Sequence, residues 1–140
     1  FKCNPDVFNT PITKFTDNKK ISLITCQQSL YYFDKKDFNK LLKNFNRSLE
    51  PKGLLFSSLI STSHTYYKHS KKTDDDWLKK VNFSGKKFKI KNYYMFYCAS
   101  EDDVVERFKN FKKIYSGSYH LVFDRKETNN HHYFILCKKK

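Results

Sequence analysis

An apolar repeat at helical spacing, set between two short apolar runs, is the feature that most restricts how this chain can fold. The repeat consists of Phe38, Leu41, Leu42, Phe45 and Leu49. It predicts an amphipathic helix over 37–49, and Asp34 and Asp37 favour its start. The flanking runs 21–26 and 54–60 are typical of buried strands. A strand–helix–strand unit of this length predicts two adjacent parallel strands with the helix packed on one face.

The remainder of the chain predicts a mixed continuation of the same sheet. Residues 62–92 are polar, and we expect them to be irregular apart from a short helix near Trp77, which follows three aspartates. Phe88 and Ile90, followed by the run 93–98, indicate extended structure. Ser100 precedes three acidic residues and predicts the start of another helix. The runs 120–124 and 133–137 predict an antiparallel pair of strands. The fold class is therefore α/β, in a single domain over 1–140, with a sheet that is parallel at first and ends in an antiparallel hairpin.

The charge of the chain leaves the nature of its partner open. The 28 basic and 14 acidic side chains give a formal net charge of +14, which suits a polyanion such as RNA. Almost all of the basic residues are lysines spread along the chain. This favours solvated lysines over a dedicated nucleic-acid surface, because arginine makes the more specific phosphate and base contacts. No apolar run approaches the ~20 residues that span a bilayer, so we expect no membrane partner.

The number and spacing of the cysteines, histidines and glycines argue against disulfides, a metal site and a phosphate-binding loop. The four cysteines, which have no C-x-x-C spacing, are Cys3, Cys26, Cys98 and Cys137. We expect reduced thiols in a cytoplasmic protein. We also expect no metal, because His64 and His69 have no cysteine nearby to complete a tetrahedral set. With three glycines in all, the chain has neither a dinucleotide fingerprint nor a phosphate-binding P-loop.

Four segments, by their order and spacing, resemble a known family. Segment 22–33 is similar to the fourth-strand motif of class I S-adenosylmethionine-dependent methyltransferases, and 37–49 looks like the helix that follows it. Segment 49–56 resembles the "L-K-P-G-G" turn before strand five. Segment 6–12 is similar to the acidic loop after strand three, with its "D-x-x-x-L-P-F" pattern. The resemblance implies the second half of a Rossmann-like methyltransferase sheet, with S-adenosylmethionine as cofactor.

The resemblance also implies which residues bind the cofactor. Asp6 is expected to accept a hydrogen bond from the adenine amino group, and the Val7 backbone N–H to meet a ring nitrogen. The alternative for Asp6 is a carboxylate that caps a turn. Cys26 and Gln27 follow the next strand, and their backbone is expected to contact the amino-acid end of the cofactor, in the crevice where open sheets bind ligands.

The methyl acceptor is expected beside the same strand. Gln28, Tyr31 and Tyr32 lie in the loop that faces the acceptor in the family, with packing against the sheet as the alternative for the tyrosines. The variable segment 62–97 is expected to cover the acceptor, and within it His64 is a substrate-binding candidate. A base is needed only where the acceptor must lose a proton, so the sequence assigns no catalytic residue.

The chain departs from the family pattern in ways that bear on activity. Ser22 stands where the family usually carries Asp, and Lys52 precedes a single glycine in the turn. The glycine-rich loop that cradles the methionine part of the cofactor is missing, as is the acidic residue that holds the ribose. We expect one of three situations: a fragment of a longer protein, a partner that supplies the N-terminal half, or a non-catalytic remnant.

The leading hypothesis is an S-adenosylmethionine-dependent methyltransferase that acts on a small molecule and is inactive as the isolated 140-residue chain. An RNA methyltransferase is the alternative enzyme. Segment 26–32 is loosely similar to the "C-Q-x-x-L-H-Y" stretch of cap guanine methyltransferases, with Tyr31 in place of His. The alternative without catalysis is an RNA-binding or scaffolding half-domain.

Overall fold

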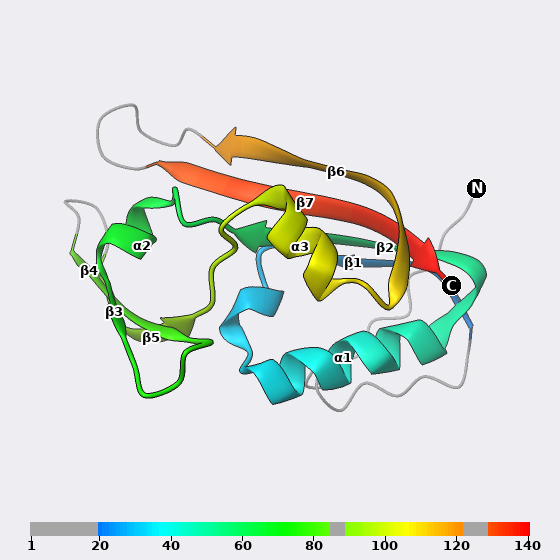
Figure 1. The fold of residues 1–140 in the computed structure, drawn as a ribbon, viewed down its shortest axis with the longest axis horizontal. Helices are drawn as coiled ribbons and strands as arrows, with labels where there is room; N and C mark the ends of the chain where they lie inside the picture. Colours follow the sequence, from blue (N-terminus) through cyan, green and yellow to red (C-terminus); the bar gives the residue numbers. More distant parts are fainter. Residues whose placement is uncertain (1–19, 85–88, 122–128) are drawn as a thin grey trace.

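The computed structural model describes residues 20–84, 89–121 and 129–140. In chain order its elements are β1 (Ile21–Cys26), the 3-10 helix η2 (Leu30–Tyr32), α1 (Lys35–Ser48), β2 (Leu49–Ile60), α2 (Thr65–Lys68), β3 (Ser70–Lys72), β4 (Lys79–Ser84), β5 (Lys89–Met95), α3 (Glu101–Arg107), β6 (Phe111–Leu121) and β7 (Asn130–Lys139). They form a four-stranded sheet and a three-stranded sheet. The smaller sheet lies beyond the end toward which β2 points (Figure 1).

The larger sheet has the strand order β1-β2-β7-β6. β1 pairs with β2 in parallel, and β7 is antiparallel to both of its neighbours. The expected sheet, parallel at first and ending in an antiparallel hairpin, is confirmed. The first strand of that hairpin is much longer than predicted. β6 spans Phe111–Leu121. Most of its residues are polar or exposed, so the sequence shows no apolar run that would have indicated the strand. The end of the predicted strand at 122–124 lies outside the described residues.

Helix α1 confirms the prediction made from its apolar repeat. It covers Lys35–Ser48 instead of 37–49, and the Asp34 side chain caps it by accepting a hydrogen bond from the Asp37 backbone N–H at 2.7 Å. All four of the residues expected to be buried are at most 3% exposed: Phe38, Leu41, Leu42 and Phe45. The Phe38 ring meets the Phe108 ring at the end of α3, with centroids 5.9 Å apart. The two helices therefore share one core on one face of the larger sheet.

The strand after α1 begins at Leu49, five residues before its predicted start, and includes the turn-like segment around Gly53. Lys52 has a φ of 68°, and the register between β1 and β2 shifts nearby, between Ile21 and Leu23. A Cβ at Gly53 would lie 3.0 Å from the Glu50 and Ile21 carbonyl oxygens. Glycine is therefore needed because the two backbones approach closely, and this explains the single glycine of the turn.

The expectation that 62–92 is irregular is wrong for most of this stretch, whereas the extended structure expected at Ile90 and from Tyr93 is confirmed as β5 up to Met95. This stretch contains α2 and most of an antiparallel sheet with the order β3-β4-β5. The polar composition concealed the sheet, because one of its faces is exposed and only Val81, Phe83 and Met95 are buried.

The predicted short helix near Trp77 is also wrong. The Asp75 carboxylate accepts a hydrogen bond from the Trp77 backbone N–H at 2.7 Å, which stabilises a turn in place of a helix start. The Trp77 indole N–H donates to the Phe33 carbonyl at 3.1 Å, and its ring packs against Phe38 and Phe96. Long-range contacts of one tryptophan therefore override a local helix signal.

The described residues also test the predictions about membrane-spanning segments, reduced thiols and metal sites. None of the described helices is long and apolar enough to cross a bilayer. Cys26, Cys98 and Cys137 are free and buried, as expected of reduced thiols, whereas Cys3 lies outside the described residues. No three His, Cys, Asp or Glu side chains of the described ranges gather as a metal site.

Replacing Phe45 by alanine tests the packing of α1. Phe45 is 3% exposed, so Phe45→Ala should lower the free energy of unfolding by ~3–5 kcal/mol, from lost burial and the cavity left behind. Lys40→Ala on the exposed side of the same helix is the control and should change it by less than about 0.5 kcal/mol. Urea denaturation measures both. Equal effects of the two substitutions would contradict the buried position of Phe45.

Candidate active site

The carboxyl ends of β1 and β2 meet at one edge of the larger sheet, where open α/β sheets bind ligands. At this edge Gln28 has a φ of 49°, a left-handed conformation that is uncommon outside glycine. Its backbone N–H donates to the Ser58 hydroxyl oxygen at 3.0 Å, and its side-chain amide donates to the Tyr119 hydroxyl at 3.4 Å. Strained residues held in this way cluster at functional sites.

The predicted cofactor residues are only partly within the described chain. Asp6 and Val7 lie outside it. Cys26 is buried at the end of β1, and its carbonyl accepts a hydrogen bond from the Ser57 hydroxyl at 3.2 Å. Burial raises the pKa of the Cys26 thiol to about 11, so this thiol stays neutral and is no nucleophile at pH 7. Gln27, the next residue, is exposed at the edge.

The two predicted acceptor-side tyrosines have different environments. Tyr31 is 5% exposed and Tyr32 is 43% exposed, with their ring centroids 4.6 Å apart. Burial, with a smaller contribution from Tyr32, raises the pKa of Tyr31 above its usual value. Tyr31 is therefore packed into the protein at this edge of the sheet, whereas the neighbouring Tyr32 exposes its ring to solvent.

His64 lies just after β2 and is buried, and its geometry argues against a role as base. Its Nδ1 accepts a hydrogen bond from the Tyr66 backbone N–H at 3.1 Å, so the neutral ring carries its proton on Nε2. Burial, and to a smaller extent His132, lowers the pKa of His64 to about 4. The neutral ring has its only lone-pair nitrogen already occupied, and it is suited to donating a hydrogen bond from Nε2.

Two ring residues of the edge were missed by the sequence reasoning, namely His132 on β7 and Tyr119 on β6. Their rings stack with centroids 5.3 Å apart and planes 10° apart. His132 Nδ1 lies 3.1 Å from the Asn130 carbonyl oxygen, which can only accept, so Nδ1 carries the proton and Nε2 keeps its lone pair. Burial is the largest cause that lowers the pKa of His132. His132 is therefore a neutral ring with an acceptor nitrogen.

His132 could have been recognised as a site residue only from the pairing register between β7 and β2. It pairs with Ile60 at the carboxyl end of β2, and its ring meets the His64 ring with centroids 5.3 Å apart. A sequence places Asn130 and His132 before an apolar run but does not give that register. The edge thus brings together three predicted residues, Gln28, Tyr31 and His64, with two that were not predicted, Tyr119 and His132. The prediction for Asp6 is not tested, because Asp6 lies outside the described residues.

Comparison with solved structures identifies the fold. A methyltransferase from Methanosarcina mazei, described as S-adenosylmethionine-dependent, superposes with a TM-score of 0.70 at 13% identity, over 93% of this chain. The 1,6-didemethyltoxoflavin-N1-methyltransferase of Burkholderia thailandensis, with bound 1,6-didemethyltoxoflavin and S-adenosylhomocysteine, superposes with a TM-score of 0.64 at 11% identity, over 94%. The fold is that of the S-adenosylmethionine-dependent methyltransferases.

The methyltransferase fold is present here over part of its length. The chain spans 65% of the Methanosarcina protein and 49% of the Burkholderia enzyme. It also spans 60% of the glycopeptide N-methyltransferase MtfA in complex with S-adenosylhomocysteine, with a TM-score of 0.62 at 11% identity over 94% of this chain. No protein-family model matches the sequence, and no curated protein matches it significantly. The likeness therefore lies in the fold, which the sequence resemblance had indicated.

An NMR titration of the histidines tests the tautomers at this edge of the methyltransferase fold. At pH 7, His64 should be protonated on Nε2 and His132 on Nδ1, as seen in nitrogen chemical shifts. His64 should take its second proton only near its pKa of about 4. A His64 ring that titrates at the ordinary histidine pKa of 6.5 would contradict the buried, hydrogen-bonded geometry.

The lowered pKa of His64 also predicts how the stability of the fold depends on pH. The pKa of His64 in the folded state lies below its value of 6.5 in the absence of structure, so between pH 6.5 and about 4 the unfolded chain binds more protons. The free energy of unfolding should therefore fall as the pH is lowered through this range, by up to about 1.4 kcal/mol per unit of pKa shift. Denaturation of His64→Gln should lose most of this slope, and an unchanged slope would contradict the assignment.

Proposed function

We propose that this chain is the C-terminal part of an S-adenosylmethionine-dependent methyltransferase that acts on a small-molecule acceptor. The observation that carries the proposal is the gathering of Gln28, Tyr31, Tyr119 and His132 at the carboxyl ends of β1 and β2. In this fold the same edge is the ligand crevice. The small-molecule methyltransferases with this fold, among them the toxoflavin and glycopeptide enzymes, support a small acceptor.

The residues present fit one part of the cofactor. Gln27 is exposed beside Gln28, whose φ of 49° ends the extended backbone of β1, and its backbone would contact the amino-acid end. Asp6 and Val7 would take the adenine edge. The bound cofactor supplies a methyl group already activated on sulfonium. The chain then has to hold the acceptor in line with it and exclude water.

Proton transfer is assigned to one of the two buried histidines, His132. The Nε2 lone pair of His132 is suited to take a proton from a neutral N–H or O–H acceptor, because the ring is fixed by Asn130 and by stacking on Tyr119. His64, with its proton on Nε2, is suited to orient the acceptor by donating a hydrogen bond. Segment 62–97 would cover the acceptor from the side of the smaller sheet.

The missing N-terminal half is proposed to come from a longer chain or from a partner. The face of the larger sheet opposite the core carries Phe56 and Phe134, half-buried with ring centroids 6.1 Å apart, and Tyr115, which is 63% exposed. On β1, Leu23 is 52% exposed. Aromatic and leucine side chains in such positions favour cover by further structure.

The mass of the native protein tests this source of the missing half. The 140-residue chain has a mass of 16.9 kDa. Mass spectrometry of the protein isolated from its source should give about twice that mass for one chain, or a stable complex with a second chain, as a domain with a complete core requires. A lone 16.9 kDa chain without a partner would contradict this proposal.

Calorimetry with S-adenosylhomocysteine tests the cofactor site. The native protein or complex should bind it, and the isolated chain should not bind tightly, because several hydrogen bonds of about 0.5–1.5 kcal/mol each are missing. Asp6→Ala should weaken binding by about tenfold or more, owing to the lost adenine contact. Asp76→Ala, an exposed carboxylate in the β3–β4 turn, is the charge-matched control and should bind normally. Micromolar binding by the isolated chain, or normal binding by Asp6→Ala, would show that the cofactor lies elsewhere.

A further inference from the structure

The smaller sheet places lysines directly opposite lysines. Its register pairs Lys71 with Lys80 and Lys72 with Lys79, on consecutive rows of β3 and β4. Like charges in directly opposed positions of an antiparallel pair destabilise it. A fold that retains two such pairs side by side carries a local cost that packing within the sheet does not explain.

No carboxylate of the described residues forms an ion pair with these lysines, although Asp74 and Asp75 line the same cavity. The ion pairs between described residues are Arg107–Asp103 and Lys109–Glu106, both elsewhere. The nearby Asp75 uses its carboxylate to cap the Trp77 N–H.

Two of these lysines make cation–π contacts with aromatic rings instead of ion pairs with carboxylates. The Lys79 ammonium lies 5.3 Å from the centre of the Tyr67 ring, and that of Lys80 lies 6.0 Å from the Tyr94 ring. A ring face attracts a cation but leaves its charge intact. The two rings therefore leave the charges of Lys79 and Lys80 available to an outside anion.

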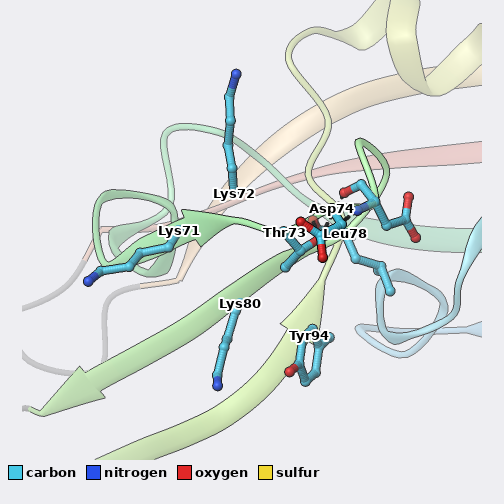
Figure 2. A pocket seen from close by; sticks show the side chains of 8 residues that line it. Lys71, Lys72, Thr73, Asp74, Leu78, Lys80 and Tyr94 are labelled. Atoms are coloured by element: carbon cyan, nitrogen blue, oxygen red, sulfur yellow. Dashed lines mark hydrogen bonds between the residues drawn. The ribbon is translucent and has the colours of Figure 1, made fainter.

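The register also defines which side chains share the outer face. Val81 and Met95 are buried, so Lys80 and Tyr94, one position before each along the strand, point to the opposite side. Lys71 joins them as the partner of Lys80. Figure 2 shows Lys80 and Tyr94 projecting to one side of the sheet and Lys72 to the other. The Tyr94 side is open, since the residue is 44% exposed and lines a cavity of about 600 Å³. The charged residues of this cavity are three lysines and two aspartates, namely Lys71, Lys72, Lys80, Asp74 and Asp75.

We propose that this outer face, made of Lys71, Lys80 and Tyr94, binds single-stranded nucleic acid. The lysines contact phosphates, and an unpaired base stacks on the Tyr94 ring. The spread cations match a chain of phosphates better than a single anion, because their ammonium groups do not converge in Figure 2. An exposed ring between cations is the arrangement that holds unpaired bases, which a duplex does not offer. The face has no exposed aliphatic side chain among its named members to insert into a lipid surface. This binding goes beyond transfer to a small acceptor and does not depend on it.

Fluorescence anisotropy with a labelled twelve-nucleotide oligouridylate tests the proposal on the full chain. The wild type should bind with steep salt dependence. The double variant Lys71→Ala/Lys80→Ala should bind about tenfold more weakly and with a shallower salt slope. Tyr94→Leu should also weaken binding about tenfold while keeping the salt slope, and Tyr94→Phe should restore it. Because the lysine variant removes a repulsion, its melting temperature should not fall.

Lys112→Ala/Lys113→Ala is the charge-matched control. These two lysines are exposed on β6, in the other sheet. The control should weaken binding by no more than about twofold. Equal loss in the control would show a general charge effect and overturn the proposal, and so would a Tyr94→Leu variant that binds like wild type. Vesicles with anionic lipid are the competing partner. If they bind more tightly than the oligonucleotide and are insensitive to Tyr94→Leu, the face belongs to a membrane and the proposal fails.

Discussion

Burial of the apolar face of α1 beside the parallel pair of β1 and β2 is the constraint on which the rest of this structure depends. Phe38, Leu41 and Phe45 are almost fully removed from water, and they can be so only if the helix returns the chain to a strand that runs in the same direction. The two strands then end at one edge. Gln28 and His64 follow these two ends, so the hydrophobic core determines where the polar site lies.

A second contact fixes the smaller sheet to this frame. The Asp103 carboxylate accepts two hydrogen bonds from the Arg107 guanidinium, at 2.9 and 3.2 Å. The guanidinium carbon lies 4.3 Å from the Trp77 ring centre and 4.8 Å from that of Phe96. The ion pair on α3 thus orients a cation that stacks on rings from the turn between β3 and β4 and from the segment after β5. This arrangement ties the smaller sheet to α3 and so to the core of the larger sheet.

Most of the larger sheet could be predicted from the sequence, but only part of the candidate site could. Helix α1 was predictable because its burial is periodic, and the parallel pair followed from the length of the crossover. In the smaller sheet only the extended structure of β5 was predictable. β3 and β4 were not, because exposed lysines conceal a buried face of only a few residues, of which Val81 and Met95 are the clearest. Local acidic residues suggested a helix at Trp77, where tertiary contacts of the ring decide the conformation. His132 was not predictable as a site residue, because only the pairing of β7 with β2 brings it to His64.

The central claim is that the edge formed by Cys26, Gln27 and Gln28 is the ligand site of a methyltransferase fold. A crystal structure of the native protein soaked with S-adenosylhomocysteine tests it most directly. The account predicts density for the amino-acid end of the ligand over the backbone of Cys26 and Gln27, with its sulfur facing the space beside Tyr31 and His132. Ligand density at any other edge of the sheet, or an empty edge at saturating ligand, would contradict it.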